Sequence, residues 1–186
     1  DENKSFGAST LEPRHIKVSG STVSVDFIGK KGVQNTGKSR SKRLSRNLRI
    51  KKRTTRANEP IFSYRRGSKW FTLKSTDVNK YLKKFGNFSS KNFRTWVANL
   101  SFITDLLKRH GSNTCKTDKQ KKDIVTESVK VCAEKLNNTP AVCKSNYIDP
   151  YIIKLYLEDT KKFTEAFKGS KTKDEISERY IKLLKH

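Results

Sequence analysis

The stretch SSKNFRTWVANLSFITDLLKRHG, residues 89–111, predicts the main architectural element of this chain. Its apolar residues recur with the period of about 3.6 residues that marks an amphipathic α-helix. Ser89 and Ser90 are suited to cap the N-terminus of this helix, and Gly111 is suited to end it. We therefore expect a long helix with Arg94 beside its apolar stripe, which comprises Phe93, Trp96, Val97, Leu100, Ile103 and Leu107. Phe93 and Trp96 are expected in the core.

The sequence after this helix predicts further helices. Residues 117–136 repeat the helical spacing with Val125, Val129, Cys132 and Leu136. A short helix is expected over 139–146, and Asp149-Pro150 begins another that runs to about residue 158. Residues 160–186 are expected to form one or two surface helices of mixed charge.

The sequence before the long helix predicts strands. β-branched residues separated by Ser-Gly and Gly-Lys-Lys-Gly favour three antiparallel strands joined by tight turns. We place these strands at residues 15–19, 22–28 and 32–36.

The segment between the strands and the long helix is strongly basic. Residues 39–56 are consistent with a helix that turns Leu44, Leu48 and Ile50 inward, or with a solvated basic tail. A short strand or extended turn is expected at 61–64 and a helix at 76–85. The predicted fold is α+β and mostly helical, a small antiparallel sheet followed by a helical catalytic domain. It comprises a β-hairpin region (6–40), a helical core (41–158) and C-terminal helices (159–186).

The charge of the chain points to a polyanionic partner. The 186 residues carry 42 Lys+Arg against 18 Asp+Glu, a formal net charge of +24. Between Phe27 and Thr76, sixteen basic residues accompany one acid, Glu59. Such an excess favours nucleic acid, with an anionic membrane surface as the alternative. No segment approaches the roughly 20 apolar residues of a membrane span.

The cysteines and histidines suggest neither disulfides nor a metal site. Cys115, Cys132 and Cys143 form no CxxC pair and are interpreted as free thiols. The three histidines are scattered along the chain and the acids are diffuse. No metal or other cofactor is therefore expected.

Four short motifs combine into one chemical hypothesis. IGKKG puts Lys30 at a hairpin tip, KNFRTW puts Lys91 and Arg94 on one side of a helix, NNTPAVC puts Asn138 at a helix start, and SNYIDP supplies Tyr147. A tyrosine hydroxyl, with an ordinary pKa near ~10, can attack a phosphodiester if cations meet the charge on the phosphate oxygens. A lysine can protonate the departing oxygen. Taken singly, each residue more often packs a turn, caps a helix or meets solvent.

In order, FGASTLEPRHIKV, VDFIGKKG, KNFRTWVAN and NNTPAVCKSNYIDP resemble the type IB DNA topoisomerases of poxviruses, giant viruses and bacteria. The resemblance covers most of residues 6–158. It implies that Tyr147 is a nucleophile that forms a 3′-phosphotyrosine link and that Arg94 contacts the scissile phosphate. It also implies that Lys30 protonates the 5′ oxygen, with Lys31 as the alternative.

The resemblance gives lesser roles to two further residues. Lys91 would assist the general acid. Asn138 stands where many members have histidine, and its amide can still donate to the phosphate. The implied activity relaxes supercoiled double-stranded DNA without ATP or metal, by a monomer acting in the bacterial cytoplasm or in a virion or viral factory. The residues expected to hold the duplex are Lys31, Lys38, Arg40, Lys42, Arg43, Arg46, Arg49, Arg65 and Arg66.

One expectation concerns the N-terminal side. The family has another catalytic arginine upstream of the segment that resembles SFGASTL, and a small N-terminal clamp domain. Neither is present here, and Arg14 is a poor substitute because its stretch is structural in the family. We expect a catalytic-domain fragment that binds DNA but cleaves it poorly.

Two other classes of protein remain as alternatives. A tyrosine recombinase shares the chemistry, but usually has histidine where this chain has Lys91. A non-enzymatic basic nucleic-acid-binding protein would explain the charge but not the ordered motifs.

Overall fold

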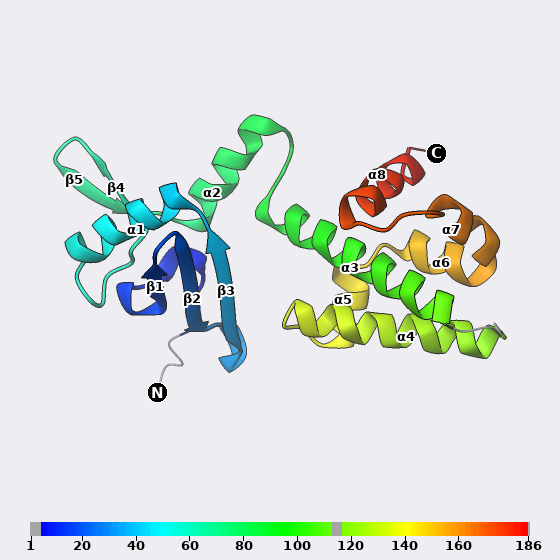
Figure 1. The fold of residues 1–186 in the computed structure, drawn as a ribbon. Coiled ribbons are helices and arrows are strands. Elements are labelled where there is room, and N and C mark those ends of the chain that lie inside the picture. Colours follow the sequence, from blue (N-terminus) through cyan, green and yellow to red (C-terminus); the bar gives the residue numbers. More distant parts are fainter. Residues whose placement is uncertain (1–4, 113–116, 186) are drawn as a thin grey trace. The chain divides into compact units, whose positions relative to one another are not determined.

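The computed structural model describes residues 5–112 and 117–185, without the side chains of Lys31 and Ser112. The chain forms two compact units, Asp1–Phe88 (unit 1) and Ser89–His186 (unit 2) (Figure 1). This division falls inside the range 41–158 that we expected to form one helical core.

Unit 1 is built on a three-stranded antiparallel sheet. Its strands are β1 (Ile16–Ser19), β2 (Thr22–Ile28) and β3 (Gln34–Arg40), in the order β1-β2-β3. Short 3₁₀ turns lie at Ala8–Thr10 (η1), Pro13–His15 (η2) and Lys30–Gly32 (η3). One face of the sheet is packed with α1 (Lys42–Thr54) around a core of Leu11, Ile16, Val23, Leu48 and Ile61.

The first two strands confirm the predicted positions, and the third corrects them. We expected a strand at 32–36, but β3 begins two residues later and ends at Arg40. The reason is that η3 uses Lys30–Gly32 for the connection, and Gly32 takes a φ of +72° that favours glycine.

The basic segment after the sheet is a helix, not a tail. Ser41 caps α1 by accepting a hydrogen bond from the Leu44 amide. Leu48 faces inward as expected, with Ser45 beside it. Leu44 and Ile50 do not, because both side chains are exposed.

Unit 1 continues with a second, smaller sheet that we predicted only in part. β4 (Ser63–Arg66) begins two residues later than the strand or extended turn expected at 61–64, and β5 (Lys69–Thr72) pairs with it through a turn at Gly67. The unit ends with α2 (Ser75–Leu82) and the 3₁₀ turn η4 (Lys83–Phe85), at the place of the helix expected over 76–85.

Unit 2 is helical throughout its described residues. It comprises α3 (Ser90–Ser112), α4 (Asp118–Lys135), α5 (Pro140–Asn146), α6 (Pro150–Glu158), α7 (Thr160–Ala166) and α8 (Lys173–Leu183). Val125, Val129 and Cys132 are buried as expected, and Leu136 packs against the same core.

The buried face of α3 differs from the predicted stripe. Phe93 and Val97 are each 54% exposed, so the expectation of Phe93 in the core was wrong. The helix instead buries Ala98, Phe102 and Leu106 together with Ile103, which rotates the core-facing side away from Phe93. Trp96 does pack against the core.

The C-terminal helices are also more buried than expected. We predicted surface helices over 160–186, but Phe163, Phe167, Ile176 and Tyr180 belong to the core of unit 2. In these short helices, charged residues are interspersed with the buried apolar residues, so the sequence pattern did not indicate which side of each helix is buried.

The α+β, mostly helical fold class is confirmed. Small antiparallel sheets come first in the chain, and helices follow. Within the described residues, no helix is both long and apolar enough to cross a membrane.

Candidate active site

The site in unit 2 begins at the C-terminal end of α4. Asn137 adopts a left-handed φ of +51°, and its amide donates to Glu134 O at 3.0 Å. The Asn138 amide donates to Ala133 O at 2.9 Å. These two bonds are the Schellman pattern that ends many helices. Leu136 is the last residue before this turn, and its carbonyl oxygen accepts neither of these two hydrogen bonds.

Arg94 is anchored at that carbonyl. It lies in the second turn of α3, and its Nη2 donates a hydrogen bond to Leu136 O. The pairing is favourable because a cation at the C-terminal end of a helix meets the negative end of the helix dipole. Arg94 is nevertheless exposed, so it can also meet a ligand from solvent.

Tyr147 lies under the same guanidinium. The Arg94 Cζ atom is 5.3 Å from the centroid of the Tyr147 ring, within the range of a cation–π contact. Tyr147 ends α5, where its amide donates to Cys143 O at 3.0 Å. The side chain is half-buried. Two residues from separate helices, which the sequence placed 53 positions apart, are therefore in contact.

A buried asparagine holds the segment that carries Tyr147. Asn99, 2% exposed, lies on α3 five residues after Arg94. Its Nδ2 donates to Tyr147 O at 2.9 Å, and its Oδ1 accepts from the Asp149 amide at 2.8 Å. One helix thus fastens both ends of the segment from Leu136 to Asp149, through Arg94 at one end and Asn99 at the other.

Asp149 extends this connection to the C-terminal helix. Its Oδ1 caps α6 by accepting from the Tyr151 amide, and its Oδ2 accepts from the Tyr180 hydroxyl at 2.9 Å. Tyr180 also stacks on Trp96 of α3, with ring centroids 5.2 Å apart. Burial and the Asp149 carboxylate raise the pKa of Tyr180, so it remains a neutral donor.

Two buried thiols lie where α5 packs against α4. Cys143 and Cys132 are both fully buried and free, and their Sγ atoms are 3.5 Å apart. Burial raises the pKa of Cys132 to about 12 and also raises that of Cys143. They are free thiols as expected, and Cys115 lies outside the described residues.

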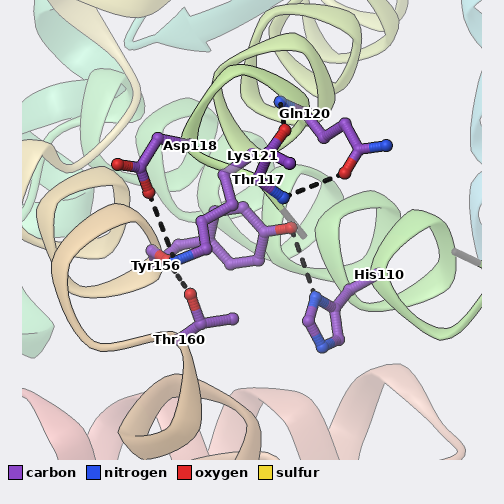
Figure 2. Close-up of polar contacts among 7 residues, drawn as sticks. All are labelled: His110, Thr117, Asp118, Gln120, Lys121, Tyr156 and Thr160. Atoms are coloured by element: carbon purple, nitrogen blue, oxygen red, sulfur yellow. Dashed lines mark hydrogen bonds and ion pairs between the residues drawn. The ribbon is translucent and has the colours of Figure 1, made fainter. Parts of the chain in front are cut away.

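The exposure of the tyrosines separates Tyr147 from a buried alternative. Tyr156 faces a histidine, with its hydroxyl 3.3 Å from His110 Nδ1, which links α6 to the end of α3 (Figure 2). However, Tyr156 is 0% exposed, so it is inaccessible to a polymer substrate, and burial also raises its pKa. Its role is to connect helices.

Asn138 and Lys91 lie in the same unit as Arg94 and Tyr147. The Asn138 Nδ2 atom is buried and has no hydrogen-bond partner among the described residues. A buried unpaired donor is costly and calls for a partner. Lys91 is exposed, one helical turn before Arg94.

Lys30 belongs to unit 1. It is exposed at the start of η3, in a connection closed by the Gly29 amide donating to Val33 O at 2.8 Å. A Cβ at Gly29 would lie 2.5 Å from Asn35 Nδ2, so a larger residue before Lys30 would displace the Asn35 side chain, which donates to Val33 O at 2.8 Å. The alternative, Lys31, has a side chain outside the described part of the structure.

Apart from Lys31, the basic residues expected to hold the duplex lie on three elements of unit 1. Lys38 and Arg40 alternate along β3 on the face of the sheet turned away from the core. On α1, a stripe of cations at intervals of three or four residues faces one side, as helical spacing requires. This stripe comprises Lys42, Arg46, Arg49 and Arg53. Arg43 is exposed beside it, and Arg65 and Arg66 are exposed on β4.

Some of these cations also hold unit 1 together. Arg49 Nη2 donates to Gly20 O at 2.6 Å, and Lys52 Nζ donates to Ile16 O. Lys51 Nζ donates to Ser63 O at 2.6 Å. Charge counting alone treats all of α1 as a binding surface, whereas these three residues are partly committed to the fold.

Sequence reasoning missed the hydrogen bonds of Asn99 and Tyr180 and predicted Asp149 only as the start of a helix. The usable signal was Asn99 itself, an amide between Ala98 and Leu100 on the apolar side of a long helix. A polar residue there needs a partner. Among the described residues, no group of three or more His, Cys, Asp or Glu side chains could hold a metal ion.

Replacing Asn99 with alanine should destabilise unit 2. The change orphans Tyr147 O and the Asp149 amide, at a cost of about 1–3 kcal/mol for each group that stays buried. Chemical denaturation followed by circular dichroism measures this loss. Asn47→Ala is the matched control, because Asn47 is exposed on α1, and it should change stability by no more than about 0.5 kcal/mol. Equal stability of the two variants would contradict the bracing role.

Most of this chain is similar in sequence to known proteins. The family model described as "Eukaryotic DNA topoisomerase I, catalytic core" matches residues 1–174. The chain is similar to "DNA topoisomerase 1B" of Acanthamoeba polyphaga mimivirus, with 30% identity over 178 residues, which cover 88% of this chain and 50% of the relative. The chain thus spans about half the length of the curated relative it matches.

Proposed function

Because the chain belongs to the type IB DNA topoisomerase family, we propose that it nicks and reseals one strand of duplex DNA and so relaxes supercoils. The observation that carries this proposal is the contact between Arg94 and the ring of Tyr147, with the guanidinium exposed. It puts a permanent cation beside a partly exposed hydroxyl-bearing side chain.

The proposed first step is a transesterification. The Tyr147 oxygen attacks the scissile phosphorus, a new phosphorus–oxygen bond forms, and the bond to the 5′ oxygen breaks. Arg94 meets the charge that gathers on the non-bridging oxygens, which fixed donors stabilise most in the transition state. Asn138, whose Nδ2 lacks a partner among the described residues, would give a second donor.

The general acid in this proposal is Lys30, which would protonate the 5′ oxygen as it leaves. This role rests on the resemblance of IGKKG and on the exposure of Lys30 at its turn. Lys31 remains the alternative, and Lys91 the assisting lysine.

The second step reverses the first. The free 5′ hydroxyl attacks the phosphotyrosine after the cut strand has rotated about its partner. Since one ester replaces another of similar energy, the cycle needs no ATP, and side-chain cations take the place of a metal. We propose a monomer that acts on double-stranded DNA inside the cell, or in a virion or viral factory.

The direct test is relaxation of supercoiled plasmid with EDTA present and ATP absent. Ladders of relaxed topoisomers are expected at high protein-to-plasmid ratios. Strand exchange between two duplexes would indicate a recombinase instead. A mobility shift without any change in topology would indicate a binding protein and contradict the proposal.

Neutralising Arg46 should lower the salt dependence of duplex binding. Each phosphate neutralised contributes about −0.9 to the slope of log K against log salt concentration. Arg46 lies in the exposed stripe of α1, so Arg46→Gln should reduce the slope by about that amount. Fluorescence anisotropy at several salt concentrations measures it. Lys161→Gln, an exposed change in unit 2, is the control, and equal slopes in the two variants would refute the contact.

A further inference from the structure

The β4–β5 hairpin of unit 1 carries exposed aromatic rings that do not pack in the core of the unit. It extends away from the three-stranded sheet beside α1 (Figure 1). Trp70 is 63% exposed, and Tyr64 and Phe71 are each 42% exposed. None of the three belongs to the core cluster of unit 1.

The register of the hairpin places aromatic and basic residues together on each face. Tyr64 pairs with Phe71, and their rings stack with centroids 5.7 Å apart and planes 20° apart. Arg66 pairs with Lys69 further along the same face, because residues two apart on a strand share a face. The opposite face carries the Arg65–Trp70 pair.

Trp70 is also oriented by a cation. Lys51 Nζ lies 4.7 Å from its ring centroid and is itself held by Ser63 O at 2.6 Å. The indole borders an open cleft of about 540 Å³ between the hairpin and the end of α1. The cleft is lined in part by Lys51, Thr54, Arg56, Trp70 and Phe71.

We propose that this hairpin binds single-stranded DNA by stacking its rings on unpaired bases. Duplex binding through phosphates requires cations but no exposed rings, whereas proteins that bind single strands combine a basic surface with aromatic stacking platforms. The segment from Ile61 to Ser75 contains four cations and no acid, which suits a polyanion. The proposal goes beyond the cleavage reaction and does not depend on Tyr147.

The test compares two DNA ligands, a single-stranded oligothymidylate and a blunt duplex of mixed sequence. The oligothymidylate should quench tryptophan fluorescence, and Trp70→Phe should remove most of the quenching, since Trp96 is packed in the core of unit 2. Trp70→Ala and Tyr64→Ala should each weaken oligothymidylate binding about 5- to 150-fold, which corresponds to the loss of one stacked base. Duplex affinity should change by less than about 2-fold.

Tyr81→Ala is the matched control. Tyr81 is 58% exposed in the same unit but lies on α2, so this variant should bind the oligothymidylate like the unchanged chain. Circular dichroism checks that each variant is folded. If Trp70→Ala does not fold, Tyr64→Ala still tests the proposal. Unchanged oligothymidylate binding, or equal losses for both DNA ligands, would overturn the proposal. A change in self-association without a change in DNA binding would assign the rings to a protein contact and overturn it as well.

Discussion

Tyr147→Phe should abolish covalent capture of DNA while leaving the fold and duplex binding nearly unchanged. The substitution removes one oxygen, and the contacts that hold the Tyr147 segment use its backbone and its ring. The phenylalanine ring can keep its place under Arg94. Without the hydroxyl, no phosphotyrosine can form.

The measurement is trapping of end-labelled duplex with SDS, followed by mass spectrometry of the adduct from the unchanged chain. The adduct should map to Tyr147, even if it accumulates slowly. Tyr151→Phe is the matched control, because Tyr151 is an exposed tyrosine four residues further along the chain; it should form the adduct normally. A persistent adduct in Tyr147→Phe, or an adduct on another residue, would exclude Tyr147 as the nucleophile.

Arg94→Ala should slow single-turnover cleavage by about 10²–10³-fold, the usual cost of removing one preorganised donor from a transition state. Arg94→Lys should recover little of this loss. The arginine uses one nitrogen on Leu136 O and has further N–H donors for a phosphate. A lysine ammonium is a single point that cannot reproduce this fork.

Rates are measured on the same labelled duplex, with binding measured separately by anisotropy. Arg179→Ala is a suitable control, because Arg179 also donates to a backbone carbonyl, but to Ala166 O at 3.4 Å rather than to the segment that carries Tyr147. It should leave the cleavage rate within a few-fold. Cleavage by Arg94→Ala at the unchanged rate would contradict the role of Arg94, and equal losses in both variants would indicate an effect on unit 2 as a whole.

The helices were predictable where their signals are local. Thr139 and Asp149 cap α5 and α6 at the predicted starts of these helices, with each proline at the first turn. The exposed Phe93 could not be predicted, because periodicity gives the width of an apolar stripe but not which part of it meets a core. The strand β5 was missed since a basic, aromatic segment resembles a binding loop as much as a strand.

The sequence proposed candidate site residues but not how their side chains contact one another. Ordered motifs identified Arg94 and Tyr147, and their contact is now evident, while their catalytic roles stay predictions. The brace through Asn99 joins residues 48 and 50 positions apart. Hydrogen bonds over such distances depend on the packing of α3 against the other helices, which one sequence does not encode in any local pattern.

The two buried free thiols, Cys132 and Cys143, allow transient opening of unit 2 to be measured by the rate at which they are labelled. The thiolate is the nucleophile that attacks an electrophilic labelling reagent, and both sulfurs are inaccessible and have raised pKa values. Labelling of these two positions must therefore wait until α4 and α5 separate. With Cys115 replaced by serine, the rate of labelling would report how often α4 and α5 separate. A slower rate of labelling with DNA bound would show how far the substrate stabilises these two helices.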